Sequence, residues 1–211
     1  MTITGAILAG GRSTRYGGLP KGLERVRGVR IIDRVRAALE PVVDDLLVIA
    51  NDDAASEWLP GVRCERDVLQ DVGSVAGIHA ALTHAASAVI VVAWDMPFVP
   101  TGLLRTLCDA GSNADAAVPE SDTSRRGLEP LCAYYASACI PAIERRIASG
   151  DARVISFYED IRLARVPADV VAQFGDPSLL FMNVNTPEER VLAEAHATTA
   201  NGGRDRQEAQ R

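Results

Sequence analysis

The sequence predicts an α/β fold in which helices cover both faces of a mostly parallel sheet. Short, mainly apolar runs at residues 4–10, 44–51 and 86–94 are typical of strands buried on both faces. Segments with apolar residues at helical spacing separate these runs, and this alternation is the pattern of βαβ units. With 211 residues, 47% of them hydrophobic, the chain is long enough for one well-buried domain.

The first half of the chain alternates regularly between the two patterns. Ser74 stands at the start of an Ala-rich helical stretch and is expected to be its N-cap. The predicted strands are 4–10, 44–51, 61–67 and 86–94, and the predicted helices are 30–42, 73–87 and 100–111.

The second half is less regular. Thr186, Pro187 and Glu189 form a capping box that predicts the start of a closing helix. Residues 198–211 are polar and predict a disordered tail, so the expected domain is 1–197, with no repeat or linker that divides it. The predicted strands are 114–121, 125–137, 161–167 and 179–185, and the predicted helices are 140–151, 154–161 and 186–197.

Composition and charge exclude several classes of protein. A net charge of −6 argues against a nucleic-acid binder that depends on overall basic charge, so any anionic ligand needs a local site. No apolar run approaches the ~18 residues of a membrane span, and glycines interrupt the N-terminal run that a signal peptide would need. The cysteines and histidines are not spaced as metal ligands, so we expect reduced thiols and a cytoplasmic protein.

Chemically useful residues follow the first four predicted strands. The first strand ends in Ala9-Gly10-Gly11-Arg12, the second in Asn51 and the fourth in Asp95, while the third leads to Asp67. Since ligands of open α/β sheets lie beyond the carboxyl ends of the strands, we expect these residues to share one binding edge.

The loop after the first strand combines glycines with positive charge. Pro20 and Gly22 flank Lys21, so the stretch does not match the P-loop, and its glycines do not fit the dinucleotide fingerprint. Glycines nevertheless let backbone N–H groups turn toward an anion, and Arg12, Arg15 and Lys21 supply charge. The alternative is a flexible basic surface loop, which would not explain its place directly after a buried strand.

The other polar residues each allow two interpretations. Asp95 ends a strongly apolar strand, and it is either a ligand of Mg²⁺ that carries nucleotide phosphates or a helix cap or buried acceptor. Asn51, Asp67 and Glu129 are either ligand contacts or ordinary turn residues. Asn183 and Asn185 flank Val184 and are expected to project together from one face of a strand.

At these positions the chain resembles the molybdenum cofactor guanylyltransferase family of nucleotidyltransferases. The resemblance covers Ile7 to about Ala195. The segments that carry it are LAGGRSTRYGGLPKGL, Asn51, Asp67 ahead of GSVAGI, WDMPFVP, EPLCAYY and FMNVNTPEE. The chain departs from the family pattern at Tyr16, at Ser74-Val75 and at Trp94, where the family usually has Met, Pro-Leu and Cys.

The resemblance implies a three-layer α/β/α, Rossmann-like nucleotidyltransferase fold of the GT-A type. It also implies transfer of GMP from GTP to the phosphate of molybdopterin, with Mg²⁺ as cofactor and release of pyrophosphate. The product would pass to molybdoenzymes or their chaperones, with no nucleic acid or membrane as partner. Residues 1–110 would form the nucleotide-binding half of the domain and residues 111–197 the acceptor-binding half.

The resemblance also assigns roles to residues. Arg15, Lys21 and Asp95 are the implied catalytic residues, and Asp95 is the implied metal ligand. Glu129, Asn183 and Asn185 are the implied acceptor contacts. The implied nucleotide-binding residues are Leu8, Ala9, Gly10, Gly11, Arg12, Lys21, Asn51, Asp67 and Asp95.

Gly10 favours GTP over CTP, because related cytidylyltransferases typically carry Ala there and Gly leaves more room for a purine. The alternatives are a cytidylyltransferase for the same cofactor, a nucleotidyltransferase for a sugar or small acid, and an adaptor that binds nucleotide without turnover.

Overall fold

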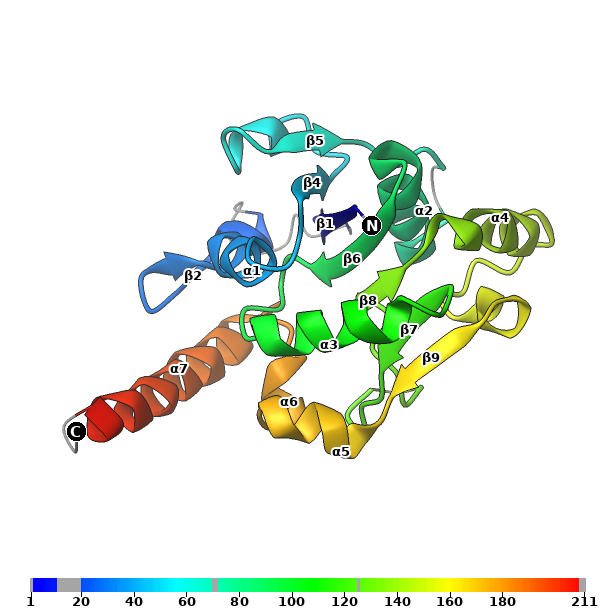
Figure 1. The fold of residues 1–211 in the computed structure, drawn as a ribbon. Helices are drawn as coiled ribbons and strands as arrows, with labels where there is room; N and C mark the ends of the chain where they lie inside the picture. The colour runs from blue at the N-terminus through cyan, green and yellow to red at the C-terminus, as the bar shows by residue number, and fades with distance from the viewer. Residues whose placement is uncertain (1, 11–19, 70–71, 125, 209–211) are drawn as a thin grey trace.

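The computed structural model describes residues 2–10, 20–69, 72–124 and 126–208. In this part of the chain the main sheet has seven strands, in the order β5-β4-β1-β6-β8-β7-β9 (Figure 1). The strands are β1 (Ile3–Leu8), β4 (Asp45–Ile49), β5 (Arg63–Glu65), β6 (Ala88–Ala93), β7 (Ala116–Pro119), β8 (Cys132–Tyr135) and β9 (Leu163–Val166).

The sheet is mixed but mostly parallel, as predicted. Strands β5, β4, β1 and β6 are parallel neighbours, and β7 and β9 are also parallel. Only β8 runs against its neighbours β6 and β7. Residues 89–92 of β6 are fully buried, which explains why this strand is an uninterrupted apolar run.

Helices cover both faces of the sheet. One core cluster packs α1 (Ile31–Leu39) and α3 (Thr101–Gly111) on one face. A second cluster packs α2 (Ser74–Ala85) and α4 (Ile140–Ala148) on the other. The expected three-layer α/β/α architecture is therefore confirmed.

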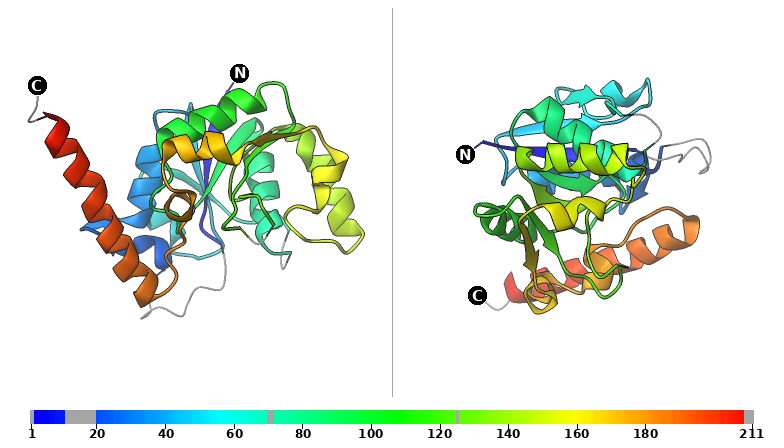
Figure 2. Two further views of the ribbon diagram at one scale, coloured as in Figure 1. Left: turned by 90° about the horizontal axis from the view of Figure 1, so that it is seen from below. Right: turned by 90° about the vertical axis from the view of Figure 1, so that its right-hand side faces the viewer.

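The last helix, α7 (Pro187–Glu208), extends away from the three layers and carries the C-terminus at its far end (Figures 1 and 2). It begins where the capping box predicted, with the Glu189 N–H donating to Thr186 Oγ1 at 3.1 Å. It continues to Glu208. The disordered tail expected over residues 198–211 stays a prediction.

Residues 156–160 form a 3-10 helix, η4 (Ser156–Asp160), within the helix predicted over 154–161. Two local predictions were wrong. The N-cap of α2 is Gly73, at φ +73°, and Ser74 is already helical. Residues 179–185 form no strand, because Asp176 caps a short helix, α6 (Pro177–Leu180), by accepting from the Ser178 N–H at 2.9 Å.

Several short elements were not predicted from the sequence. Arg27 and Gly28, both at positive φ, form the turn between β2 (Arg25–Val26) and β3 (Val29–Arg30). The remaining elements of this kind are α5 (Ala168–Val171) and the 3-10 helices η1 (Lys21–Leu23), η2 (Ala55–Glu57), η3 (Ser137–Cys139) and η5 (Ala172–Phe174).

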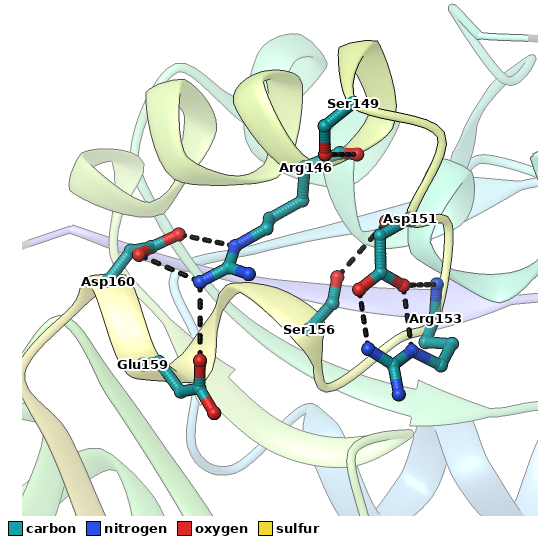
Figure 3. Close-up of polar contacts among 7 residues, drawn as sticks. All are labelled: Arg146, Ser149, Asp151, Arg153, Ser156, Glu159 and Asp160. Atoms are coloured by element: carbon teal, nitrogen blue, oxygen red, sulfur yellow. Dashed lines mark hydrogen bonds and ion pairs between the residues drawn. The ribbon is translucent and has the colours of Figure 1, made fainter.

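Ion pairs close the segment between α4 and η4 (Figure 3). Arg146 donates to both carboxylate oxygens of Asp160 at 2.6 and 2.9 Å, and Arg153 forms the same kind of bidentate pair with Asp151. Exposed pairs of this kind stabilise a protein by only about 0–1 kcal/mol each. The buried Phe157 and Tyr158 of η4 therefore anchor this segment more strongly than its charges do.

All four cysteines are free thiols, buried at Cys132 and Cys139 and half-buried at Cys64 and Cys108. No helix in the described ranges combines the length and apolar character that crossing a bilayer requires.

Candidate functional site

The first four parallel strands end at one edge of the sheet. Leu8 at the end of β1 pairs in register with Ile49 of β4 and Ala93 of β6, and Ile49 pairs with Glu65 of β5. The residues that follow these positions therefore emerge along a common rim, as predicted from the sequence. Gly10, Asn51, Asp67 and Asp95 all lie there, whereas Gly11, Arg12 and Arg15 lie outside the described residues.

The end of β1 forms the centre of the rim. Leu8 and Ala9 are buried, and their backbone groups are paired: the Ala9 N–H donates to Ile49 O at 2.8 Å and Leu8 O accepts from the Trp94 N–H at 3.1 Å. Gly10 is exposed, and a Cβ built on it would meet no atom within 4 Å. Packing among the described residues therefore does not require a glycine at this position.

Asn51 and Asp67 form a reciprocal pair on one side of this centre. The Asn51 side-chain amide donates to Asp67 Oδ2 at 2.8 Å, and Asn51 Oδ1 accepts from the Asp67 N–H at 3.0 Å. Asn51 is exposed and Asp67 is half-buried, and a cavity of about 430 Å³ adjoins Asp67. The pair thus holds an oriented carboxylate at the ends of β4 and β5.

Lys21 and Asn185 meet on the other side of the centre. Lys21 opens η1, and its Nζ donates a hydrogen bond to Asn185 Oδ1 across 164 residues of sequence. The Asn185 N–H donates to Glu189 Oε2 at 2.6 Å, in the first turn of α7. The Val184 N–H donates to the backbone carbonyl of Asp95 at 2.9 Å, which ties this segment to the end of β6.

Asp95 lies within the electrostatic reach of Lys21. Burial raises the pKa of its carboxyl group, nearby Lys21 and its own backbone N–H lower it, and Glu189 raises it. Lys21 acts on this carboxylate through its charge, since its own hydrogen bond goes to Asn185, and no side chain in the described residues donates a hydrogen bond to Asp95. It is not a helix cap, since the N-cap of the following helix, α3, is Pro100.

Glu129 reaches the same rim from the antiparallel strand β8. Cys132 pairs with Val92 of β6, so the residues that precede Cys132 pass the end of β6. Burial raises the pKa of Glu129, and a hydrogen bond from Ser124 partly offsets this. Asn183 is exposed whereas Asn185 is half-buried against Lys21. The prediction that these two asparagines project together was wrong, because the segment is not a strand.

Three features of the site were not predicted from the sequence. Glu189 was recognised only as part of a capping box, yet its carboxylate also holds the backbone of Asn185. Arg190 lines a narrow crevice with Lys21, Glu24, Val184 and Thr186. The ring of Trp94, seen in the sequence only as a departure from the family pattern, packs on Gly22 and stacks on Trp58.

The rim thus has two polar groups with β1 between them. Asp67 follows β5 and Asp95 follows β6, three strand spacings apart, or roughly 14 Å at about 4.8 Å per spacing. That is the length scale of a nucleoside triphosphate. No cluster of three or more acidic, cysteine or histidine side chains in the described residues could hold a metal ion by itself.

Comparison with known proteins agrees with this geometry. The family model of the MobA-like NTP transferase domain matches residues 5–166. A probable molybdenum cofactor guanylyltransferase of Pelotomaculum thermopropionicum is 37% identical over 95% of this chain and 96% of its own length. A molybdenum cofactor guanylyltransferase of Desulfosudis oleivorans is 35% identical over 92% of this chain and 95% of its own.

A solved structure, molybdopterin-guanine dinucleotide biosynthesis protein A of Archaeoglobus fulgidus, superposes with a TM-score of 0.77 at 30% identity. The match covers 93% of this chain and 99% of that one. The chain belongs to the family of MobA-like NTP transferases.

Proposed function

We propose that this nucleotidyltransferase moves GMP from GTP to the phosphate of molybdopterin, forming the guanine dinucleotide cofactor and pyrophosphate. The observation that carries the proposal is the divided rim, with an oriented carboxylate at one end and a lysine beside a half-buried aspartate at the other. The likeness to guanylyltransferases over almost the whole chain supports guanine and molybdopterin as its substrates.

GTP would lie along the rim with its guanosine at Asn51 and Asp67. The Asp67 carboxylate is a suitable acceptor for N–H groups of guanine or hydroxyls of ribose, and Asn51 holds it in place. Backbone N–H groups of Gly10, Gly11 and Arg12 would then hold the triphosphate beyond Leu8 and Ala9. Arg15 and Lys21 would neutralise its charge.

Mg²⁺ fits the other end of the rim. Mg²⁺ is commonly bound by one or two carboxylates together with substrate phosphates, which suits a single desolvated Asp95 carboxylate. When bound, the ion would neutralise phosphate charge and favour departure of pyrophosphate. The Asn185 amide oxygen, which accepts from Lys21, lies on the segment tied to Asp95.

The reaction needs no protein nucleophile. An oxygen of the acceptor phosphate attacks the α-phosphorus of GTP, a new P–O bond forms, and the bond to the β-phosphate oxygen breaks as pyrophosphate leaves. The acceptor phosphate is already ionised at neutral pH, with a second pKa of about 6. The protein therefore acts by positioning and charge, with residues 1–110 binding nucleotide and residues 111–197, including Glu129, Asn183 and Asn185, binding the acceptor.

The test is pyrophosphate release measured with Mg²⁺ and each nucleoside triphosphate, with and without molybdopterin. We expect release with GTP and molybdopterin together, and none with Asp95→Asn under the same conditions. Release with CTP, or with a sugar phosphate as acceptor, would replace the proposed substrates. Binding of GTP without pyrophosphate under any acceptor would identify a nucleotide-binding adaptor instead.

Gly10 gives this test a second arm. Since a Cβ at position 10 meets no atom of the described residues within 4 Å, Gly10→Ala should leave the free energy of unfolding nearly unchanged. If the open space belongs to the nucleotide, the variant should lose activity with GTP by at least about tenfold, a difference of about 1.4 kcal/mol. Unchanged activity with GTP would show that Gly10 does not contribute to the choice of the nucleotide base.

A further inference from the structure

The Trp94 ring lies directly against the backbone of Gly22. A Cβ built on Gly22 would be 2.3 Å from Trp94 Cε3 and 2.7 Å from Cδ2, distances that no real side chain tolerates. Gly22 is buried and immediately follows Lys21. The indole therefore fixes how closely the segment that carries Lys21 approaches the end of β6.

The same ring stacks on Trp58, with centroids 4.9 Å apart and planes inclined by 20°. Trp94 and Trp58 are only 3% and 5% exposed. The Trp58 carbonyl accepts from Arg30 Nη1 at 3.0 Å, and Arg30 is bound through two nitrogens to Asp33 of α1. This arrangement supports the Trp94 ring from behind and leaves it little freedom to turn.

Trp94 thus joins three segments that carry proposed site residues. It precedes Asp95 in the chain, its ring contacts the neighbour of Lys21, and its stacking partner belongs to the segment that follows Asn51. Its backbone N–H also donates to Leu8 O, at the centre of the rim.

We propose that Trp94 is a positioning residue whose ring, backed by Trp58, sets the place of Lys21 relative to Asp95 for the triphosphate. The inference rests on the proposed function, since it concerns the nucleotide end of that site. A flat, rigid ring against a glycine gives a contact distance that a flexible aliphatic side chain would not hold. Small displacements of a charged group in such a site can lower the rate about a hundredfold.

The first test compares Trp94→Cys with Ile143→Ala. Ile143 is a buried residue of α4 in the other core cluster, so its variant controls for lost packing. Trp94→Cys should lower kcat/KM for the nucleotide by at least about tenfold, with the KM for the acceptor changed less than about threefold. Ile143→Ala should change both by less than about threefold. A Trp94→Cys enzyme with unchanged kcat/KM for the nucleotide would overturn the proposal.

The second test uses the contact between Gly22 and the ring. Gly22→Ala should impair nucleotide use because its Cβ collides with the indole, but Gly22→Ala combined with Trp94→Cys should be no worse than Trp94→Cys alone. If the fold-losses in kcat/KM of the two single variants multiply in the double variant, the Trp94 ring does not set the position of the segment that carries Gly22. The comparison holds for whichever nucleotide the wild type uses, so it is independent of whether GTP is the donor.

The third test is spectroscopic, since Trp58 and Trp94 are the only tryptophans of the chain. Adding nucleotide to the metal-free protein should change the tryptophan emission, and Trp58→Phe should keep this response. Trp94→Phe should lose most of it, because the remaining indole is one ring further from Gly22. Equal responses in the two variants would contradict the proposed role of Trp94.

Discussion

Lys21 is the only lysine in this chain, and the rest of its 22 lysine and arginine residues are arginines. The ammonium group of this lysine donates to Asn185 Oδ1 and acts on the half-buried Asp95 carboxylate. Lysine is a compact point charge, whereas the planar guanidinium of arginine is larger and donates in fixed directions. A chain that uses arginine everywhere else therefore indicates that this site requires an ammonium group.

Lys21→Arg should accordingly fail although it keeps the charge. We expect kcat/KM for GTP to fall at least tenfold, with the free energy of unfolding changed by less than about 1 kcal/mol. Steady-state kinetics and urea unfolding measure the two quantities. Full activity of the variant would show that any cation suffices.

The single lysine also allows a direct check of its place. An amine-reactive ester can modify only Lys21 and the N-terminus, and mass spectrometry distinguishes the two. GTP should protect Lys21 and leave the N-terminus reactive.

Glu129 makes the pH dependence of stability testable. Burial raises its pKa in the folded state, so folding becomes less favourable as the pH rises from about 4.5 through that higher pKa. Glu129→Gln removes this loss. The variant should gain stability relative to wild type between pH 4 and pH 7.5, measured as urea midpoints at both values. A difference that is constant with pH would show that the carboxyl group ionises as freely in the folded state as in the unfolded one.

At the scale of elements, the start of α7 supports the site. The Thr186 hydroxyl caps the helix, and the Glu189 carboxylate accepts from the Asn185 N–H, so the helix end holds the residue that binds Lys21. Thr186→Ala should lower the free energy of unfolding by about 1 kcal/mol. It should also raise the KM for GTP, because the Asn185 segment loosens.

The control for this helix start lies in the segment of Figure 3. Ser156 donates to the carbonyl of Asp151 at 3.1 Å, so Ser156→Ala removes one hydrogen bond far along the chain from Thr186. Its stability cost should be similar, about 1 kcal/mol. Its KM for GTP should stay at the wild-type value. If Thr186→Ala and Ser156→Ala had the same KM for GTP, the start of α7 would not contribute to nucleotide binding.

Local patterns predicted most of the elements but not all of their partners. The apolar run of β6 and the helical periodicity of α1 are each visible within a short stretch of the sequence, so both elements could be predicted from it. The apolar run at 179–185 is buried without being a strand, since Phe181 and Val184 are buried from an irregular segment. Burial and strand geometry give the same apolar signal over such a short length.

At the scale of the whole molecule, the rim could be predicted because consecutive parallel strands end at one edge. The contact between Lys21 and Asn185 could not, because 164 residues separate the two and no periodicity records that pairing. The antiparallel β8, inserted between β6 and β7, likewise follows from long-range packing. The sequence thus predicted the residues at the ends of the parallel strands, but not the long-range contacts that complete the site.

One continuous sheet joins the proposed nucleotide and acceptor halves. Strand β8 of the second half pairs with β6 of the first from Val89–Tyr135 to Val92–Cys132, and one core cluster contains both Trp94 and Tyr134. Neither half could lose its structure without exposing the apolar face of the other. We therefore expect both to unfold in a single cooperative transition.

The two halves carry separate reporters for this prediction. Tryptophan emission follows Trp58 and Trp94 in the first half, and the reactivity of the buried Cys132 thiol follows the second. Pulse labelling of Cys132 across a urea series should give the same midpoint as the emission, because β6 and β8 separate only when both halves unfold. If Cys132 became reactive at a lower urea concentration than the emission change, the acceptor half would unfold by itself. The sheet would then be two cooperative units joined at β6 and β8.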